Sequence, residues 1–448
     1  MAAWLSLLLI IILYVVSFVD RHIIALLVEP IKHDLGLSDA QIGLLQGMAF
    51  SITYALAGLP IGWLVDRYSR RTIIFCGIVG WSIAAMTTGL SRNFWQMFAA
   101  RAGVGVGEAT LAPAGLSLIS DLFPRERLAT ALSFYTAGSN IGGGLAFMIG
   151  GLVVGGLAAS PTVEAPLFGT IASWQAVFMI VGAPGLLFAF LVLAIREPRR
   201  GARTQGDGPD AASFLRALGQ RSGVLAAHWT AFPILALCTY STSLWVPSWS
   251  MRQFGWTAQE IGLLMGFSNG ILAVGANLTS GYLTDLAFRH GMRDAHFRIP
   301  AITCSIGTAI CIFGLVGISS GTAAVWVVIL GATIQMAYGG AAFSSLQLVM
   351  PPQMRGRATS VYMLILTLVG FGIGPFVVGY LADNLFGNST GLGKSLALTL
   401  GVATCIAVLI LLSGRRALRH AFADAEREAA TLPASAPCSG PSGRYATH

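Results

Sequence analysis

Charged residues are scarce in this chain. Asp, Glu, Lys and Arg together make up only 10% of its 448 residues, whereas hydrophobic residues make up 55%. Soluble domains usually carry about 25% charged residues, so this composition excludes an ordinary soluble globular protein. Long apolar runs separated by short polar segments instead predict an all-α polytopic membrane protein.

Cysteines are few, and the motifs of several enzyme classes are missing. None of the six cysteines forms a Cys-x-x-Cys pair, so we expect no metal site and no disulfide bonds. The sequence has no His-Glu-x-x-His, Walker or Ser/Lys motif, which argues against an intramembrane enzyme. Gly103, Gly105 and Gly107 follow no predicted strand, so they do not indicate a dinucleotide site. We therefore expect no enzyme activity and no cofactor.

Twelve apolar segments are long enough to cross a membrane, since about 20 helical residues cover the hydrocarbon core. A polar segment at 196–222 divides them into two groups of six. We expect an N-terminal six-helix bundle over 1–195, a linker over 196–222, a second bundle over 223–413 and a polar cytoplasmic tail over 414–448. The spans are expected at 4–28, 40–65, 72–90, 94–120, 128–156, 170–195, 223–250, 259–284, 299–318, 322–349, 358–382 and 392–413.

The first and last of these segments raise two questions about the ends of the chain. The N-terminal residues lack the basic segment and cleavage site of a signal peptide, so we expect the first apolar run to remain as a span. It begins with almost no polar flank, which leaves an upstream extension open. The tail is rich in Pro, Ser and Gly and is predicted to be disordered beyond about residue 430.

Lysine and arginine are distributed unevenly between the two sides of the predicted spans. Of 27 such residues, Arg21 and Arg101 fall within spans and 21 fall on the side of the termini. Cytoplasmic loops carry the excess of positive charge, so we expect both termini in the cytoplasm, in a bacterial inner membrane. The net charge of +8 is thus an orientation signal and not a nucleic-acid-binding surface. The four cations on the opposite side are Lys32, Arg92, Arg252 and Lys394.

Asp20 and Arg21 are charged residues inside the first predicted span. Each charge costs at least about 2.5 kcal/mol at insertion, so both must face protein or water and be paired. A functional role is the default interpretation of such residues, and the alternative is an ion pair that only fixes helix packing. Adjacent helical residues point about 100° apart, so either Asp20 or Arg21 faces the interior directly.

Arg101 and Glu108 carry opposite charges in the fourth predicted span. At 1.5 Å per residue, Arg101 lies about 10 Å and Asp20 about 12 Å below the same membrane surface, so we expect Arg101 to face Asp20 or to lie one side chain away from it. Glu108 lies about 10 Å deeper on the same helix face. Arginine stays charged and binds phosphate or carboxylate, whereas a carboxylate can take up a proton. We predict Asp20 as the first and Glu108 as the second candidate for proton coupling, with His22 either a relay or a packing residue.

The two groups of spans share a loop pattern. Gly62–Asp66 (GWLVD) ends the second span, and Gly281–Asp285 (GYLTD) ends the eighth, 219 residues later. Gly62–Arg71 (GWLVDRYSRR) resembles the G-x-L-x-D-R-x-G-R-R/K loop signature of the major facilitator superfamily, with Ser69 in place of the second glycine. This resemblance implies two pseudo-symmetric six-helix bundles that transport by alternating access.

The same resemblance implies a cytoplasmic gate at this loop. Asp66 is expected to meet the N-terminus of span eleven, where the helix dipole favours an anion. For Arg70 and Arg71, anchoring at the cytoplasmic membrane surface is the alternative role. The predicted gate residues are Gly62, Asp66, Arg67, Arg70, Arg71 and Asp285.

Within the superfamily, the chain resembles the Spinster transporters of sphingolipids and lysolipids. This resemblance rests on the Asp20-Arg21 pair and on Arg101–Ala109 (RAGVGVGEA) in the first half alone. The superfamily implies a central cavity between spans one, four, seven and ten. The predicted substrate contacts are Arg21, Arg101, Tyr14, Ser17, Tyr240, Trp245, Gln335 and Tyr338.

A charged wall in the first half and an apolar, aromatic wall in the second favour an amphipathic substrate with an anionic head. We therefore predict proton-coupled transport of a lysophospholipid-like or sphingosine-phosphate-like lipid, or of a hydrophobic drug. Proton-coupled symport of an organic anion is the alternative, because bacterial organic-anion permeases share part of the first-span pattern. A transporter-like receptor is a further alternative function. The predicted partners are the lipid bilayer, protons and a small substrate, with no nucleic acid, and the protein is expected to be a monomer.

Overall fold

The computed structural model describes residues 2–158, 160–165, 169–195, 197–198, 211–387 and 391–431. Eleven helical segments in these ranges are long and apolar enough to cross a membrane, and a shorter apolar helix covers Ile141–Leu157. The all-α polytopic fold expected from composition is confirmed. The observed segments begin and end close to the predicted spans; the span predicted at 40–65, for example, is Asp39–Arg67.

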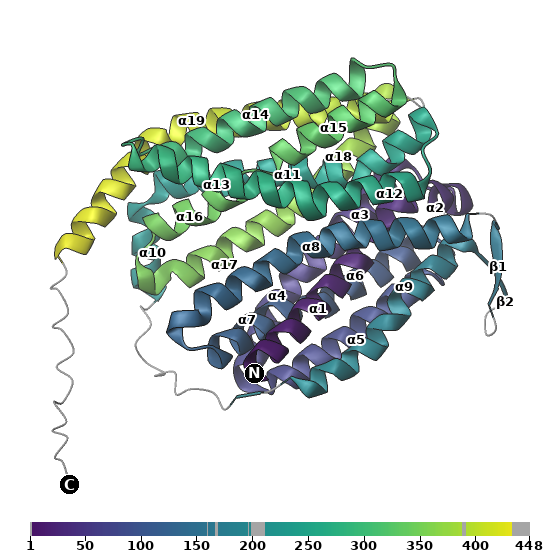
Figure 1. Ribbon diagram of the computed structural model, residues 1–448, viewed down its shortest axis with the longest axis horizontal. Helices are drawn as coiled ribbons and strands as arrows, with labels where there is room; N and C mark the ends of the chain where they lie inside the picture. Colours follow the sequence, from purple (N-terminus) through teal and green to yellow (C-terminus); the bar gives the residue numbers. More distant parts are fainter. Residues whose placement is uncertain are drawn as a thin grey trace, which may run out of the picture.

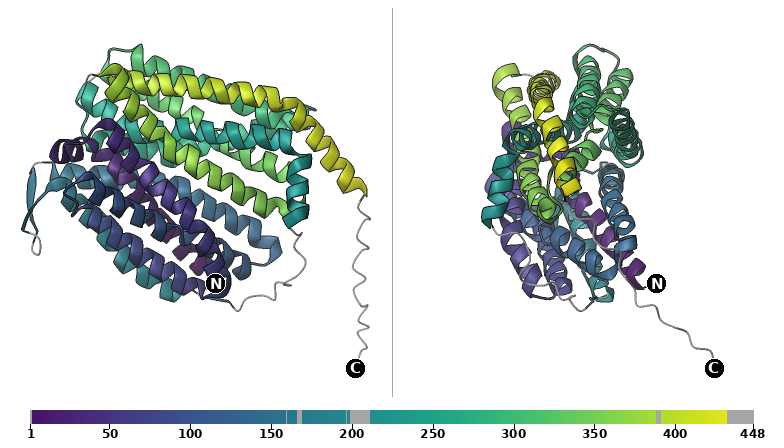
Figure 2. Two further views of the ribbon diagram at one scale, coloured as in Figure 1. Left: turned by 180° about the vertical axis from the view of Figure 1, so that it is seen from behind. Right: turned by 90° about the vertical axis from the view of Figure 1, so that its left-hand side faces the viewer.

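The helices form two bundles, which are drawn in purple to blue and in teal to yellow in Figures 1 and 2. The first bundle consists of α1 (Ala2–His22), α2 (Val28–Leu35), α3 (Asp39–Gln46), α4 (Met48–Arg67), α5 (Arg70–Thr88), α6 (Phe94–Glu108), α7 (Leu111–Leu122), α8 (Arg125–Leu157) and α9 (Ser173–Ala189). The second consists of α11 (Ser222–Phe254), α12 (Ala258–Phe267), α13 (Ala273–Arg289), α14 (Ala295–Val316), α15 (Gly321–Gln335), α16 (Gly339–Val349), α17 (Arg355–Ile365), α18 (Gly374–Leu381) and α19 (Gly391–Thr431).

The molecule has two distinct ends. The first residues of α1 and the last residues of α19 lie at one end, which we call the termini end (Figures 1 and 2). The opposite end carries a short antiparallel hairpin of β1 (Thr162–Ala165) and β2 (Gly169–Ala172), in which Thr162 pairs with Ala172; we call it the hairpin end. The sequence analysis did not predict these strands, because four-residue strands between two spans leave no hydropathy signal.

Several spans are interrupted at polar residues. The fourth predicted span is divided into α6 and α7 directly after Glu108, and the tenth into α15 and α16 after Gln335. Each break releases backbone carbonyl groups from the helix, which other donors must then satisfy. The Thr110 hydroxyl, for example, donates to the Gly107 carbonyl oxygen at 2.7 Å. The first span likewise ends in a 3-10 turn, η1 (Ile23–Leu26), and the second bundle contains the π-helical turns η3 (Ser268–Leu272), η5 (Leu366–Ile373) and η6 (Ala382–Phe386).

Glycines line two interfaces between the bundles. At the α3–α18 seam, a Cβ added to Gly43 would lie 2.4 Å from the Pro375 carbonyl oxygen, and one on Gly379 would lie 2.2 Å from the Asp39 carbonyl oxygen. At the α8–η3 seam, a Cβ on Gly144 would lie 2.6 Å from the Cα of Gly270. Small residues allow helix backbones to approach this closely, so side chains are excluded from both seams.

The linker and tail differ in part from the prediction. The amphipathic piece expected after the first bundle is α10 (Ala211–Gln220), whereas residues 199–210 lie outside the described part of the chain. The tail predicted from residue 414 is instead helical as far as Thr431, because α19 continues beyond the apolar run. Its extension buries Leu418 and Phe422, and the Phe422 ring packs against Phe288 at 5.5 Å. The disorder predicted beyond residue 430 falls almost wholly on residues that are not described.

Candidate functional site

Arg21 and Glu108 form an ion pair between α1 and α6. Nη2 of Arg21 donates to Oε2 of Glu108, and the two side chains are 11% and 1% exposed. The guanidinium also lies over the rings of Phe18, Phe50 and Tyr54, at 5.0, 4.4 and 5.6 Å from their centroids. Aromatic faces attract cations, so residues from three helices stabilise one permanent positive charge.

Arg101 supports the end of α1 from α6. It is fully buried, and its Nη1 and Nη2 atoms donate to the backbone carbonyl oxygens of Asp20 and Arg21 at 3.0 and 3.3 Å. These carbonyls belong to the last turn of α1, where helical partners run out. The structure therefore brings Arg101 and Asp20 together, but through the backbone carbonyl of Asp20.

Asp20 is a buried carboxyl group with few polar partners. The residue is 2% exposed, and its Oδ2 atom has no hydrogen-bond partner. Within the described ranges, the ion pair of this site is the one between Arg21 and Glu108, and Asp20 takes part in none. The Oε1 atom of Glu108 also lacks a hydrogen-bond partner among the described residues. The two candidate proton carriers thus differ, because one carboxylate has a cation and the other does not.

Tyr14, Ser17 and His22 surround the site through packing and local hydrogen bonds. Tyr14 stacks on Tyr135 of α8 with a centroid distance of 4.7 Å, and the Ser17 hydroxyl donates to the Tyr14 carbonyl oxygen at 2.9 Å. The buried His22 ring stacks on Phe18 at 5.7 Å, and its Nδ1 atom lies 3.1 Å from the Phe18 carbonyl oxygen. This ring is engaged on its own helix, which matches a packing role for His22.

Tyr240 is the residue of the second bundle that reaches the charged site. Its ring lies 6.2 Å from that of His22 and 4.8 Å from that of Phe371. Tyr338, also predicted as a substrate contact, stacks on Phe232 at 6.2 Å within the second bundle. Of these two predicted contacts, Tyr240 therefore packs against the first bundle, at His22, whereas Tyr338 packs within its own bundle.

Trp245 and Gln335, two further predicted contacts, are used inside the second bundle. The Trp245 Nε1 atom donates to the Pro375 carbonyl oxygen at 2.9 Å. The Gln335 Nε2 atom donates to the Thr308 hydroxyl at 2.7 Å. Both side chains are fully buried in the described structure, so in this conformation neither is placed to touch a substrate.

The predicted gate residues lie at the termini end, in the C-terminal parts of α4 and α13 and at the start of α5. Asp66 and Asp285 are exposed, and Gly62 is partly exposed. The Arg67 guanidinium lies over the Trp63 ring, 3.9 Å from its centroid. The role of Asp66 in a gate stays a prediction.

Arg70 is buried and ties parts of the first bundle to one another. Its Nη1 atom pairs with Asp121 of α7, and its Nε atom lies 3.6 Å from Oε1 of Glu197, which follows α9. Arg71 donates to the Leu193 carbonyl oxygen at 3.2 Å. Glu197 also accepts hydrogen bonds from the Ser69 hydroxyl and the Arg70 backbone N–H. Although burial acts in the opposite direction, these bonds and the Arg70 charge hold the pKa of Glu197 below its usual value.

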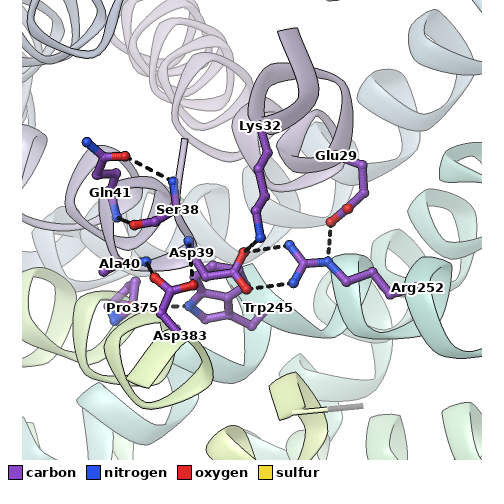
Figure 3. Close-up of polar contacts among 10 residues, drawn as sticks. All are labelled: Glu29, Lys32, Ser38, Asp39, Ala40, Gln41, Trp245, Arg252, Pro375 and Asp383. Carbon is purple, nitrogen blue, oxygen red and sulfur yellow. Dashed lines mark hydrogen bonds and ion pairs between the residues drawn. The ribbon is translucent and has the colours of Figure 1, made fainter. Parts of the chain in front are cut away.

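The structure also contains a polar cluster that the sequence analysis missed. At the hairpin end, Asp39 of the first bundle binds Arg252 of the second, as Figure 3 shows. A signal for it was present, since Lys32 and Arg252 are two of the four cations that oppose the positive-inside pattern. Both of these cations bind the same carboxylate, Asp39.

Comparison with known proteins agrees with this arrangement. Residues 10–375 match the family model of the Major Facilitator Superfamily. An MFS-type efflux pump from Mycolicibacterium smegmatis is 26% identical over 386 residues, which cover 85% of each chain. A D-galactonate transporter from Escherichia coli is 25% identical over 402 residues, which cover 85% of this chain and 89% of its relative. The crystal structure of a bacterial homologue of the human lysosomal transporter Spinster, inward-facing and unoccupied, gives a TM-score of 0.79 at 25% identity and covers 95% of this chain and 98% of its own.

Proposed function

Because the chain belongs to the major facilitator superfamily, we propose that it moves an anionic substrate by alternating access and couples this movement to protons. It is a multi-pass membrane transporter of the Spinster type, and the relatives found are transporters and not enzymes. The resemblance drawn from the Asp20-Arg21 and RAGVGVGEA segments is thereby confirmed. Substrate class, coupling and orientation form the proposal.

The Arg21–Glu108 pair carries the proposal. A phosphate or carboxylate binds a guanidinium bidentately, so an anionic substrate competes with Glu108 for Arg21. Once substrate takes the guanidinium, Glu108 is a buried carboxylate without its cation, and a proton removes the cost of that charge. Binding of an anion and binding of a proton are thus linked at one site.

Asp20 is the second proton site of the proposal. Asp20 is a buried carboxyl group that forms no ion pair in the described structure, and a proton would remove the cost of burying its charge. Its backbone carbonyl accepts a bond from Arg101, which also holds the carbonyl of Arg21. A change in the charge of Asp20 therefore acts on the segment that positions Arg21, so both carboxylates require testing.

The aromatic surroundings of Arg21 favour an amphipathic substrate. Phe18, Phe50 and Tyr54 contact the guanidinium, and the Tyr240 ring of the second bundle lies 6.2 Å from the ring of the neighbouring His22. Apolar surface next to one cation suits a lysophospholipid or a sphingosine-phosphate-like lipid, and it also accepts hydrophobic drugs. The second candidate substrate is a small organic anion, because one relative is a D-galactonate transporter.

Orientation is part of the same proposal. The termini end faces the cytoplasm and the hairpin end faces outward, in the inner membrane of a bacterium, because 21 of 27 cations lie toward the termini. Interbundle polar contacts at the hairpin end support an inward-facing state, as does the similarity to an inward-facing Spinster homologue. A cysteine placed by Gly206→Cys in the linker should escape impermeant thiol reagent outside intact cells. Efficient labelling there overturns this orientation.

Flux in proteoliposomes tests substrate and coupling together. We expect an imposed pH gradient to drive uptake of a lysophospholipid more strongly than uptake of galactonate. Glu108→Gln should bind substrate but lose gradient dependence, because glutamine keeps the shape of the side chain and cannot titrate. Asp20→Asn should also weaken the dependence, and Glu260→Gln, which removes an exposed carboxylate of a helix cap, is the matched control. Unchanged gradient dependence in both Glu108→Gln and Asp20→Asn overturns the proton mechanism, and stronger galactonate flux favours the second candidate substrate.

A further inference from the structure

At the hairpin end, Arg252 of the second bundle forms a bidentate ion pair with Asp39 of the first. The Nη1 and Nη2 atoms of Arg252 donate to Oδ2 and Oδ1 of Asp39, each at 2.7 Å (Figure 3). Lys32 adds a bond to Oδ1 at 2.7 Å, and Glu29 accepts from Nε of Arg252 at 2.5 Å. Bidentate pairs of this kind are among the stronger hydrogen-bonded contacts in proteins. The bundles are thus joined by a largely buried pair.

A second contact at this end runs in the reverse direction, with the carboxylate supplied by the second bundle. Asp383 of η6 accepts hydrogen bonds from the backbone N–H groups of Asp39 at 3.1 Å and Ala40 at 2.7 Å (Figure 3). These are the first two residues of α3, whose dipole favours a negative charge at this position. Asp383 therefore caps a helix of the other bundle.

The cap of α3 is incomplete without the second bundle. The first backbone N–H groups of a helix have no partner within the helix. In α3, Ser38 and Gln41 satisfy each other's N–H groups through a capping box, with distances of 2.9 and 3.2 Å. The remaining two N–H groups, of Asp39 and Ala40, are those that Asp383 takes. Separation of the bundles at this end exposes two uncapped N–H groups to water.

The glycine seam brings the cap within reach. Gly43 and Gly379 let α3 and α18 touch backbone to backbone, since any Cβ there would lie within 2.4 Å of a carbonyl oxygen. Asp383 is the second residue of η6, two residues after the end of α18. The close approach of α18 to α3 is therefore what places the Asp383 carboxylate at the N-terminus of α3.

We propose that Asp39, Arg252 and Asp383 form a two-part latch that closes the hairpin end and breaks whenever the bundles part there. The inference rests on the proposed function, because a latch matters only in a protein whose bundles separate. In the first part, Asp39 and Glu29 of the first bundle bind Arg252 of the second, and in the second part Asp383 of the second bundle binds the N-terminus of α3. On opening, Asp39 keeps Lys32 of its own bundle while water solvates Arg252 and Asp383, so the latch is reversible.

Distances between spin labels test the latch in the full-length protein in lipid nanodiscs. One pair of labels on His33→Cys and Lys394→Cys spans the hairpin end, and a second on Ser120→Cys and Arg289→Cys spans the termini end; all four positions are exposed. The exposed native cysteines Cys76 and Cys405 and the tail cysteine Cys438 are first replaced by serine.

Removal of either part of the latch should open the hairpin end. Asp39→Asn and Asp383→Asn should each raise the ratio of open to closed hairpin-end distances about tenfold, which corresponds to ~1.4 kcal/mol. The double variant should exceed either single variant, and the termini-end distances should shorten in parallel. Arg92→Gln removes a cation at the same end that lies outside the latch, and it should leave both distributions unchanged.

A wedge variant tests the same closure without a change of charge. Gly43→Ala should shift the hairpin-end distances in the same direction as Asp39→Asn, whereas Gly58→Ala, where nothing lies within 4 Å of the new Cβ, should not. Gel filtration and melting temperature establish that each variant is folded. If Asp39→Asn does not fold, Gly43→Ala alone tests whether the hairpin end opens. The latch is overturned if every folded latch and wedge variant has the distance distributions of the unmodified protein. This conclusion requires that the distances in the unmodified protein still respond to substrate. Distances that respond to neither substrate nor pH at either end of the unmodified protein overturn the proposed function instead.

Discussion

The two bundles place a polar residue at the same kind of break but use it differently. In the first, α6 ends at Glu108, whose carboxylate binds a cation on another helix. In the second, α15 ends at Gln335, whose amide donates to Thr308 of the same bundle, and Thr308 in turn bonds Thr404 at 2.9 Å. Both residues are buried, but only one is charged.

The charged Glu108 and the uncharged Gln335 differ in what it costs to bury them. A charged group inside a membrane protein is costly to bury and therefore usually has a function, whereas an amide with its hydrogen bonds satisfied fixes helix packing at little cost. The first bundle places four charged residues together at Asp20, Arg21, Arg101 and Glu108, while the second presents aromatic surface through Tyr240. This contrast supports the proposal made above, in which the charged residues of the first bundle bind an anionic substrate and the second bundle offers it an apolar, aromatic surface.

The largest expected effect comes from removal of the cation of the first bundle. Arg21→Met keeps the length of the side chain but leaves Glu108 buried without a partner, which typically costs about 3–5 kcal/mol. We expect substrate binding to be lost and the melting temperature to fall. The double variant Arg21→Met/Glu108→Leu should recover much of the stability, because apolar pairs often replace buried ion pairs without loss, but not the binding. Wild-type affinity in Arg21→Met would place the anion site elsewhere.

A smaller effect is expected at the buried arginine that ties α5 to α7. Arg70→Ala removes a charge-assisted hydrogen bond to Asp121 and a longer ion pair with Glu197, and it should cost about 1.5–3 kcal/mol in unfolding free energy. Its neighbour provides the control, since Arg71→Ala removes a more exposed side chain and should stay within about 0.5 kcal/mol. Thermal unfolding in detergent measures both. Equal effects would mean that Arg70 acts only as a membrane anchor, like Arg71.

Gln335→Leu tests the scaffolding role of the second bundle. The change removes the hydrogen bond to Thr308, which keeps Thr404 as a partner, so we expect a loss of about 0.5–1.5 kcal/mol in unfolding free energy. Flux and its pH-gradient dependence should persist. Loss of transport in a folded Gln335→Leu protein would show that the break after α15 belongs to the substrate site, and the contrast between the bundles would fail.

The smallest effect concerns acid stability at the termini end. The pKa of the Glu197 carboxyl is lowered in the folded protein, so its contribution is present at neutral pH and is lost as the pH falls from the usual glutamate range through the lowered value. Glu197→Gln should therefore lower the melting temperature slightly at pH 7 and not at pH 3. An identical difference between variant and wild type at both pH values would contradict this assignment.

Hydropathy located the spans because each span must match the thickness of the bilayer, which requires about 20 consecutive apolar residues. The depths of Asp20 and Arg101 followed from helical rise in the same way. Helix rotation does not follow from rise, so the sequence left open whether Asp20 or Arg21 faces the interior, and Arg101 was expected to face the Asp20 carboxylate when it binds the carbonyls instead. The hairpin-end cluster was missed because Asp39 and Asp383 lie 344 residues apart at helix ends, where no periodic pattern links them.

The glycine seams also decide where this protein can be stiffened. Replacing a helical glycine by alanine stabilises many proteins by about 0.5–1 kcal/mol, since it removes backbone freedom from the unfolded chain. Gly80 and Gly275 suit this change, because a new methyl group meets nothing within 4 Å. Gly144 and Gly379 do not, because the same methyl group would strike backbone atoms of the opposite bundle. Engineering of this transporter for crystallisation or prolonged storage therefore has to leave its interbundle glycines unchanged. In a glycine-to-alanine scan, substitutions at these glycines should destabilise the contact between the bundles, and those at open positions should stabilise the protein.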